Sequence, residues 1–195
     1  MVYNDSEISS TPVKILIAGG FGAGKTTFVG AASEIDPLDT EEVITTASVG
    51  IDDLGGTADK STTTVAFDFG RITLPQQNIV LYLFGTPGQE RFWFMWDELS
   101  AGALGAIVVA DAGRLADSFS VLDFFESRGI YFLVAVNEFD GGFRYAPEEV
   151  RVALGLDQRV PIVSCDARDT HSARGVLRSL VQYLLLSARS SSAVP

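Results

Sequence analysis

Residues 19–27 of the chain read Gly19-Gly20-Phe21-Gly22-Ala23-Gly24-Lys25-Thr26-Thr27, which matches the pattern GxxxxGK(S/T). The match follows an apolar run at 13–18 and enters a stretch for which a helix is predicted. Glycines let the backbone wrap closely around a phosphate with its N–H groups pointing inward, and a helix N-terminus adds a favourable dipole. The alternative is a glycine-rich turn that matches by chance. The flanking elements favour a phosphate-binding loop.

Two side chains of this loop are suited to phosphate chemistry. Lys25 is expected to place a point charge on the terminal phosphates, and the hydroxyl of Thr26 is placed to ligate Mg²⁺. The loop alone does not say which nucleotide is bound, or whether the reaction is hydrolysis or transfer to an acceptor.

Around this loop, short apolar runs alternate with amphipathic stretches of helix length. The runs interpreted as strands are 13–18, 64–74, 78–84, 103–109, 130–136 and 160–163. Helices are expected at about 24–34, 114–126, 147–154 and 171–187. The alternation predicts an α/β fold of the P-loop NTPase kind. Its sheet has six mostly parallel strands, with 64–74 as one antiparallel edge strand and helices on both faces.

Length and composition predict a single domain at 13–188, and the phosphate-binding loop makes it the nucleotide-binding domain. The chain has 195 residues and is 47% hydrophobic, which is enough for a single buried core. Polar ends at 1–12 and 189–195 are expected to be flexible tails.

Charge and cysteine content narrow the function classes. The net charge of −11 repels phosphate backbones and anionic lipid, so nucleic acid is not an expected partner. Cys165 is the single cysteine, which excludes an intramolecular disulfide and fits a cytoplasmic protein. No apolar run reaches the roughly 18 residues of a membrane span, so no integral membrane segment is expected.

A second motif addresses the choice of base. Asn137-Glu138-Phe139-Asp140 follows the run at 130–136. A carboxylate at Asp140 can accept from both guanine N1–H and N2–H, a pair of donors that adenine lacks. By itself the pattern NxxD is equally an ordinary turn, because Asn and Asp open turns. In register with the phosphate-binding loop, it favours a guanine nucleotide.

With these motifs in order, the chain resembles the Ras-like small GTPases over residues of about 13–187. Among them it is most similar to the bacterial gliding-motility and actinobacterial conservon types. The resemblance implies a molecular switch that binds GTP or GDP with Mg²⁺ and slowly hydrolyses GTP. It also implies regulatory partners in signal transduction, namely roadblock-type and sensor-kinase-like proteins.

The resemblance assigns further phosphate-side residues. Gly85-Thr86-Pro87-Gly88-Gln89-Glu90 resembles DxxGQE, so Gly88 belongs to the phosphate site and Gln89 orients the attacking water. Thr64 resembles the switch threonine that joins Thr26 on the metal, with Thr62 and Thr63 as close rivals.

On the base side, Asp166-Ala167-Arg168 stands where the family has SAK and offers the Ala167 N–H to guanine O6. Asn137 and Glu138 complete the set of base-binding residues with Asp140.

Three departures from the family pattern predict weak binding or slow turnover. Gly85 replaces the acid of DxxG, Glu138 replaces the lysine of NKxD, and Phe21 stands where a small residue is usual. Thr63 occupies the place of the intrinsic arginine of some relatives, so an arginine comes in trans or is Arg91. These departures leave a hydrolysis-deficient nucleotide-binding scaffold as the alternative function.

Two further stretches have open interpretations. The long polar segment between Thr26 and Thr64 suits a switch loop or a disordered insertion. Phe92-Trp93-Phe94-Met95-Trp96 suits a partner surface, or core packing for at least Phe92 and Trp96.

Overall fold

The structure is a computed structural model that describes residues 10–36, 38–45, 62–88, 92 and 95–191, with backbone alone at 38–45, 62–66 and 190–191. Most of the two predicted tails lies outside the described residues. The last helix extends to Ser191, past the predicted domain boundary at 188.

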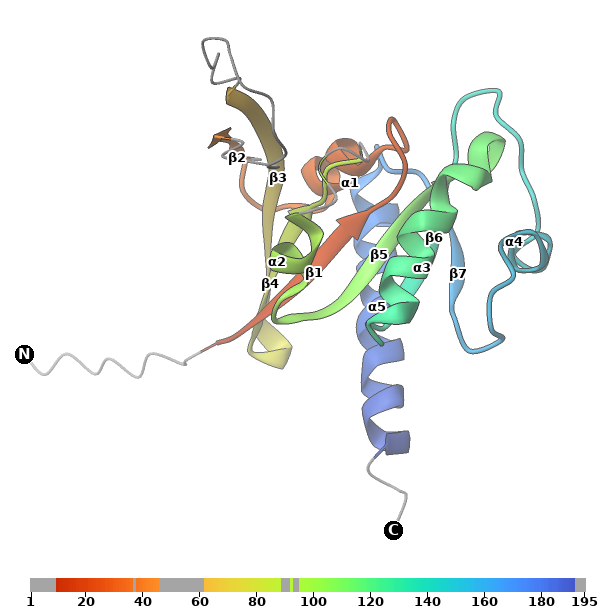
Figure 1. Cartoon of the computed structure of the whole chain (residues 1–195). Helices are drawn as coiled ribbons and strands as arrows, with labels where there is room; N and C mark the ends of the chain where they lie inside the picture. Colours follow the sequence, from red (N-terminus) through yellow and green to blue (C-terminus); the bar gives the residue numbers. More distant parts are fainter. Residues whose placement is uncertain (1–9, 37, 46–61, 89–91, 93–94, 192–195) are drawn as a thin grey trace, which may run out of the picture.

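The strands form one sheet in the order β2-β3-β4-β1-β5-β6-β7 (Figure 1). Five neighbouring strands pair in parallel, whereas β3 is antiparallel to both β2 and β4. The bounds are β1 (Thr11–Ala18), β2 (Leu38–Thr45), β3 (Thr62–Leu74), β4 (Ile79–Gly85), β5 (Ala103–Asp111), β6 (Phe132–Asn137) and β7 (Ile162–Cys165). The predicted mostly parallel α/β fold is confirmed.

The outer strand β2 is not among the strands predicted from the sequence. All six expected strands are present, and β2 adds a seventh beyond β3, which corrects the predicted edge position of residues 64–74. The segment Leu38–Thr45 carries three acids and lies in a polar stretch, so it was included in the long loop. Its backbone pairs with β3 along its whole length, and such pairing satisfies the peptide groups whatever the side chains are.

Helices cover both faces of the sheet. They are α1 (Lys25–Ala32), α2 (Trp96–Ser100), α3 (Phe119–Ser127), α4 (Pro147–Leu154) and α5 (Thr170–Ser191), with the 3₁₀ segments η1 (Pro75–Gln77) and η3 (Ala112–Ser118). Along β1, Ile15 and Ile17 pack into a core with α1 and α5, while Leu16 and Ala18 pack into a second core with α3 and α4. This alternation is the two-residue period of a strand buried on both faces.

The carboxyl ends of the parallel strands meet at one edge of the sheet, the upper edge in Figure 1. Strand β1 lies between β4 and β5, so the chain connections on its two sides run toward opposite halves of the sheet. Ligands of α/β sheets commonly bind at the carboxyl end of such a position. The loop at 19–24, the residues after β4, the segment η3 and the loops after β6 and β7 all begin at this edge.

The phosphate-binding loop is packed against its neighbour β5. Gly19 has φ +144°, and a Cβ atom there would lie 2.2 Å from the carbonyl oxygen of Val109. Both the backbone angle and the close approach require glycine at this position.

In the described part of the chain, no helix has the combined length and hydropathy that crossing a membrane requires.

Candidate functional site

The loop at 19–24 is folded around the ammonium group of Lys25. The Nζ atom donates to the carbonyl oxygens of Gly19 (3.0 Å) and Gly20 (2.8 Å), and the residue is 9% exposed. Burial lowers the pKa of Lys25 to about 8, and the charge of Asp68 opposes part of that shift. A lysine held in this way needs an anion to stabilise its charge, and bound phosphate would supply one.

A carboxylate that the sequence analysis did not assign lies beside Thr26. The Thr26 hydroxyl donates to Asp68 Oδ2 at 2.8 Å, and Asp68 comes from β3. A Cβ atom at Gly85 would lie 2.8 Å from the Cβ of Asp68 and 2.7 Å from its Oδ2. Side chains at 85 and 68 would therefore compete for one space. The acid missing from β4 is matched by an acid on the neighbouring strand.

The residues after β4 lie over the phosphate-binding loop. The Thr86 N–H donates to the carbonyl of Ile17 at 2.8 Å. At Gly88, a Cβ atom would lie 2.6 Å from Lys25 Nζ and 3.1 Å from the backbone of Phe21, so a side chain there would crowd the loop. The predicted phosphate-site residues Gly88 and Lys25 are brought together.

Several residues named by the resemblance are not described. Gln89 and Arg91 lie outside the described residues, and so do the side chains of Thr62, Thr63 and Thr64. Their roles stay predictions.

Asn137 connects the phosphate loop to the loop after β7. Its side chain is almost fully buried; Nδ2 donates to the Ala23 carbonyl at 3.0 Å, and Oδ1 accepts from the Ala167 N–H at 3.0 Å. A Cβ atom at Gly24, which has φ +105°, would lie 2.5 Å from Asn137 Nδ2. Three segments far apart in the sequence therefore meet at this side chain.

The side chains and the backbone N–H expected to bind the base contact other residues of the same chain. Arg168 donates to the exposed Asp140 carboxylate at 2.6 and 3.1 Å and also to Asp166. This guanidinium lowers the pKa of Asp140, and it lowers that of Asp166 to about 2. Glu138 pairs with Arg144 at 3.1 Å. The Ala167 N–H, expected to face guanine O6, donates to Asn137.

The segment after β5 also contacts the phosphate-binding loop, and its residues are not among the predicted site residues. A Cβ atom at Gly20 would lie 2.6 Å from the Cβ of Asp117, and one at Gly22 would lie 3.4 Å from Nη2 of Arg114. From the sequence, these residues are expected at the start of a helix at about 114–126. The signal that could have found them is that β5 was predicted to be central and parallel, so its carboxyl end meets the ligand edge.

The aromatic segment after the DxxGQ-like motif packs inward where it is described. Trp96 is 2% exposed and lies edge-on to Phe124, with ring centroids 5.0 Å apart. Phe92 packs against a buried pair, Phe67 and Met95. The packing interpretation is confirmed for Phe92 and Trp96.

The lowered pKa of Lys25 predicts a pH dependence of stability. Because the folded-state pKa is about 8 and the ordinary value is 10.5, folding disfavours the charged amine. The free energy of unfolding of the ligand-free protein is expected to rise between these pH values by about 3 kcal/mol through Lys25. Urea unfolding across this range should show that Lys25→Met removes the rise. Parallel curves for wild type and variant would contradict the assignment.

Comparisons with known proteins give the family and the fold. A family model described as "Conserved hypothetical ATP binding protein" matches residues 17–186. An uncharacterized protein of Methanocaldococcus jannaschii is 32% identical over 132 residues, which cover 67% of this chain and 72% of that protein.

Among solved structures, the G domain of the T. maritima FeoB iron transporter has a TM-score of 0.61 at 18% identity, covering 88% of this chain and 98% of that one. The FeoB G domain of Methanococcus jannaschii has a TM-score of 0.60 at 13% identity, covering 89% and 98%. At these identities the likeness shows the fold. The chain belongs to the family described as conserved hypothetical ATP binding proteins, and its fold is that of a P-loop G domain.

Proposed function

We propose that the chain is a guanine-nucleotide switch of the bacterial Ras-like type, which binds GTP or GDP with Mg²⁺ and slowly hydrolyses GTP. The observation that carries this proposal is the position of Asn137, bonded to Ala23 of the phosphate loop and to Ala167 of the loop after β7. One nucleotide can therefore reach the phosphate loop and the base loops together. The single cysteine supports a cytoplasmic location.

The description of the family names ATP, whereas the carboxylate of Asp140 favours guanine. The proposed preference for guanine therefore depends on Asp140. Guanine presents two adjacent donors, N1–H and N2–H, that match the two carboxylate oxygens, whereas adenine has an acceptor at N1. In the structure, Arg168 pairs with this carboxylate. Because both side chains are more than half exposed, water screens the pair, and exchanging it for a base costs little.

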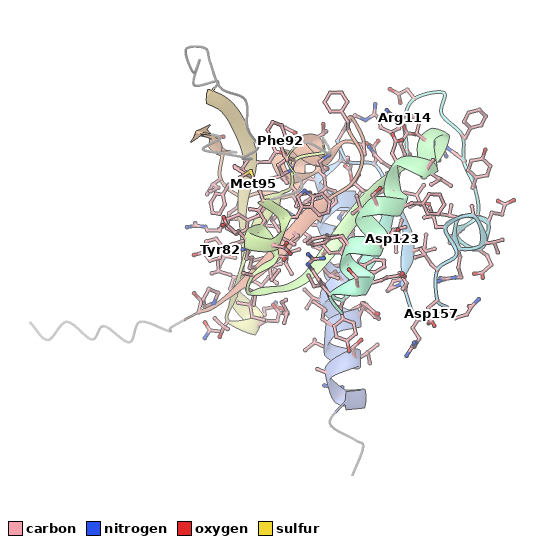
Figure 2. All side chains as sticks on the ribbon, in the orientation of Figure 1. Tyr82, Phe92, Met95, Arg114, Asp123 and Asp157 are labelled. Carbon is pink, nitrogen blue, oxygen red and sulfur yellow. The ribbon has the colours of Figure 1, made fainter. Side chains whose placement is uncertain are left out.

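The variant Asp140→Asn tests the base. Its amide replaces one acceptor by a donor, so affinity for GTP is expected to fall at least about tenfold and affinity for xanthosine triphosphate to rise. Fluorescence titration with GTP, ATP and xanthosine triphosphate measures the change. Asp157→Asn is the control, since Asp157 is also an exposed carboxylate paired with an arginine. It precedes the parallel strand β7, whereas the base loops follow β6 and β7, so it lies at the other edge of the sheet (Figure 2). Wild-type protein that binds ATP as tightly as GTP would show the guanine assignment to be wrong.

The metal position is proposed at Thr26, Asp68 and Thr64. Within the described residues, no group of three His, Cys, Asp or Glu side chains could hold a metal. A metal there would take most ligands from phosphate oxygens and water, which is how Mg²⁺ is usually bound with nucleotides. A hydroxyl and a carboxylate 2.8 Å apart beside Lys25 fit that chemistry. Bound Mg²⁺ would neutralise charge on the phosphates.

Exchanging residues 68 and 85 tests this position. Asp68→Ala is expected to raise roughly tenfold the Mg²⁺ concentration that half-maximally slows GDP release. The double variant Asp68→Gly with Gly85→Asp moves the acid to β4 and removes the clash, so it should recover most of the loss. Release of a fluorescent GDP at graded Mg²⁺ gives both values. An unchanged Mg²⁺ requirement in Asp68→Ala would remove Asp68 from the site.

The second candidate function is a nucleotide-binding scaffold that barely hydrolyses GTP. Phe21 is 66% exposed in the phosphate loop, where its ring can hinder an attacking water or an incoming arginine. Either function is proposed to work with roadblock-type and sensor-kinase-like partners.

Hydrolysis itself is tested by Gln89→Ala. If Gln89 orients the water, single-turnover GTP hydrolysis should slow roughly tenfold or more while GDP affinity stays unchanged. Equal rates for the two proteins would favour the scaffold.

A further inference from the structure

An arginine on the segment after β5 lies against the phosphate-binding loop. Arg114 belongs to η3, and Figure 2 shows it at the edge of the sheet from which that loop also rises. The contact is close, since a Cβ atom at Gly22 would lie 3.4 Å from Arg114 Nη2. Nearby, Asp117 packs on Gly20 in the same way.

Neighbouring acids orient the guanidinium. Asp111 accepts from Arg114 Nε at 3.0 Å and from the Gly113 N–H at 2.8 Å, and Asp117 lies 3.6 Å from Nη1. These contacts engage Nε and Nη1, which lie on different edges of the guanidinium. Nη2 is the atom nearest to the loop. The side chain is 47% exposed, so a ligand has access to it.

The guanidinium of Arg114 lies beside the part of the loop that is expected to bind phosphate. Gly22 is one of the glycines whose backbone is expected to wrap a phosphate chain. A triphosphate carries several negative charges, and Lys25 supplies one cation to it. A planar guanidinium, with donors in a fixed fork, is well matched to phosphate oxygens.

We propose that Arg114 is a second phosphate-binding cation of this site, which donates from Nη2 to the phosphate chain of a bound nucleotide on the Gly22 side of the loop. The inference rests on the proposed nucleotide binding and goes beyond it by assigning a residue outside the loop and outside the motifs in the sequence. Asp111 and Asp117 act as positioning residues that hold the guanidinium toward the loop.

Binding measurements on Arg114→Ala, Arg114→Lys and wild type test this assignment. Fluorescence competition with GTP, GDP and guanosine separates the phosphate chain from the base and ribose. For Arg114→Ala, affinity for GTP and GDP should fall about tenfold or more, and affinity for guanosine should not change. Arg114→Lys keeps the charge without the fork and should recover part of the loss.

Arg159→Ala is the matched control. Arg159 is also an exposed arginine held by a neighbouring aspartate, Asp157, and Figure 2 shows Asp157 well below Arg114 in the view. Its nucleotide affinities should equal those of wild type. Ionic strength provides an independent readout, because an ion pair with phosphate is screened by salt. The affinity of Arg114→Ala should therefore fall less steeply with added salt than that of wild type.

The outcomes are distinguishable. If wild type binds GDP and Arg114→Ala binds it equally well, the role of Arg114 is overturned and the proposed function stands. If Arg114→Ala loses affinity for guanosine as much as for GDP, with an unchanged salt dependence, the residue acts only on the fold of η3 and the inference is overturned. Wild-type protein that binds no nucleotide overturns the proposed function itself.

Discussion

The buried amide of Asn137 is the contact on which the rest of the site depends. Its nitrogen holds the Ala23 carbonyl and its oxygen holds the Ala167 N–H, both at 3.0 Å. A buried amide that loses one partner leaves a polar group without water, which costs far more than an exposed hydrogen bond. The geometry of the phosphate loop is thereby coupled to that of the loops after β6 and β7, although the three segments are distant in sequence.

Charge at this site is arranged locally in a protein of strongly negative net charge. Lys25 bonds to loop carbonyls, with Asp68 close enough to affect its pKa, and Arg114 is held by Asp111 and Asp117. Each cation is therefore oriented by contacts within the protein. Such preorganisation lowers the cost of ordering side chains on binding.

Asp68 and Gly85 lie on neighbouring strands and share one space at the ligand edge. Antiparallel pairing of β3 with β4 brings Phe69 opposite Phe84, so the next residues, Asp68 and Gly85, are neighbours at the ligand edge. Removing the side chain at 85 opens the space that the Asp68 carboxylate occupies beside Thr26. A motif analysis of β4 alone finds a missing acid, whereas the paired strands contain one.

The sequence by itself determined the features that depend on neighbouring residues: the glycine loop entering a helix, the six apolar strands, and the polar turn Asn137–Asp140. Periodicity, glycine content and turn chemistry are local, so they can be interpreted in chain order. Tertiary structure decided the rest: the backbone pairing of β2, the burial of Trp96, the reach of Asp68 to Thr26, and the packing of Arg114 on Gly22. These contacts join residues far apart in the chain, so local sequence patterns do not determine them. The contacts of Asp68 and Arg114 form where the sheet brings the ends of its strands to one edge.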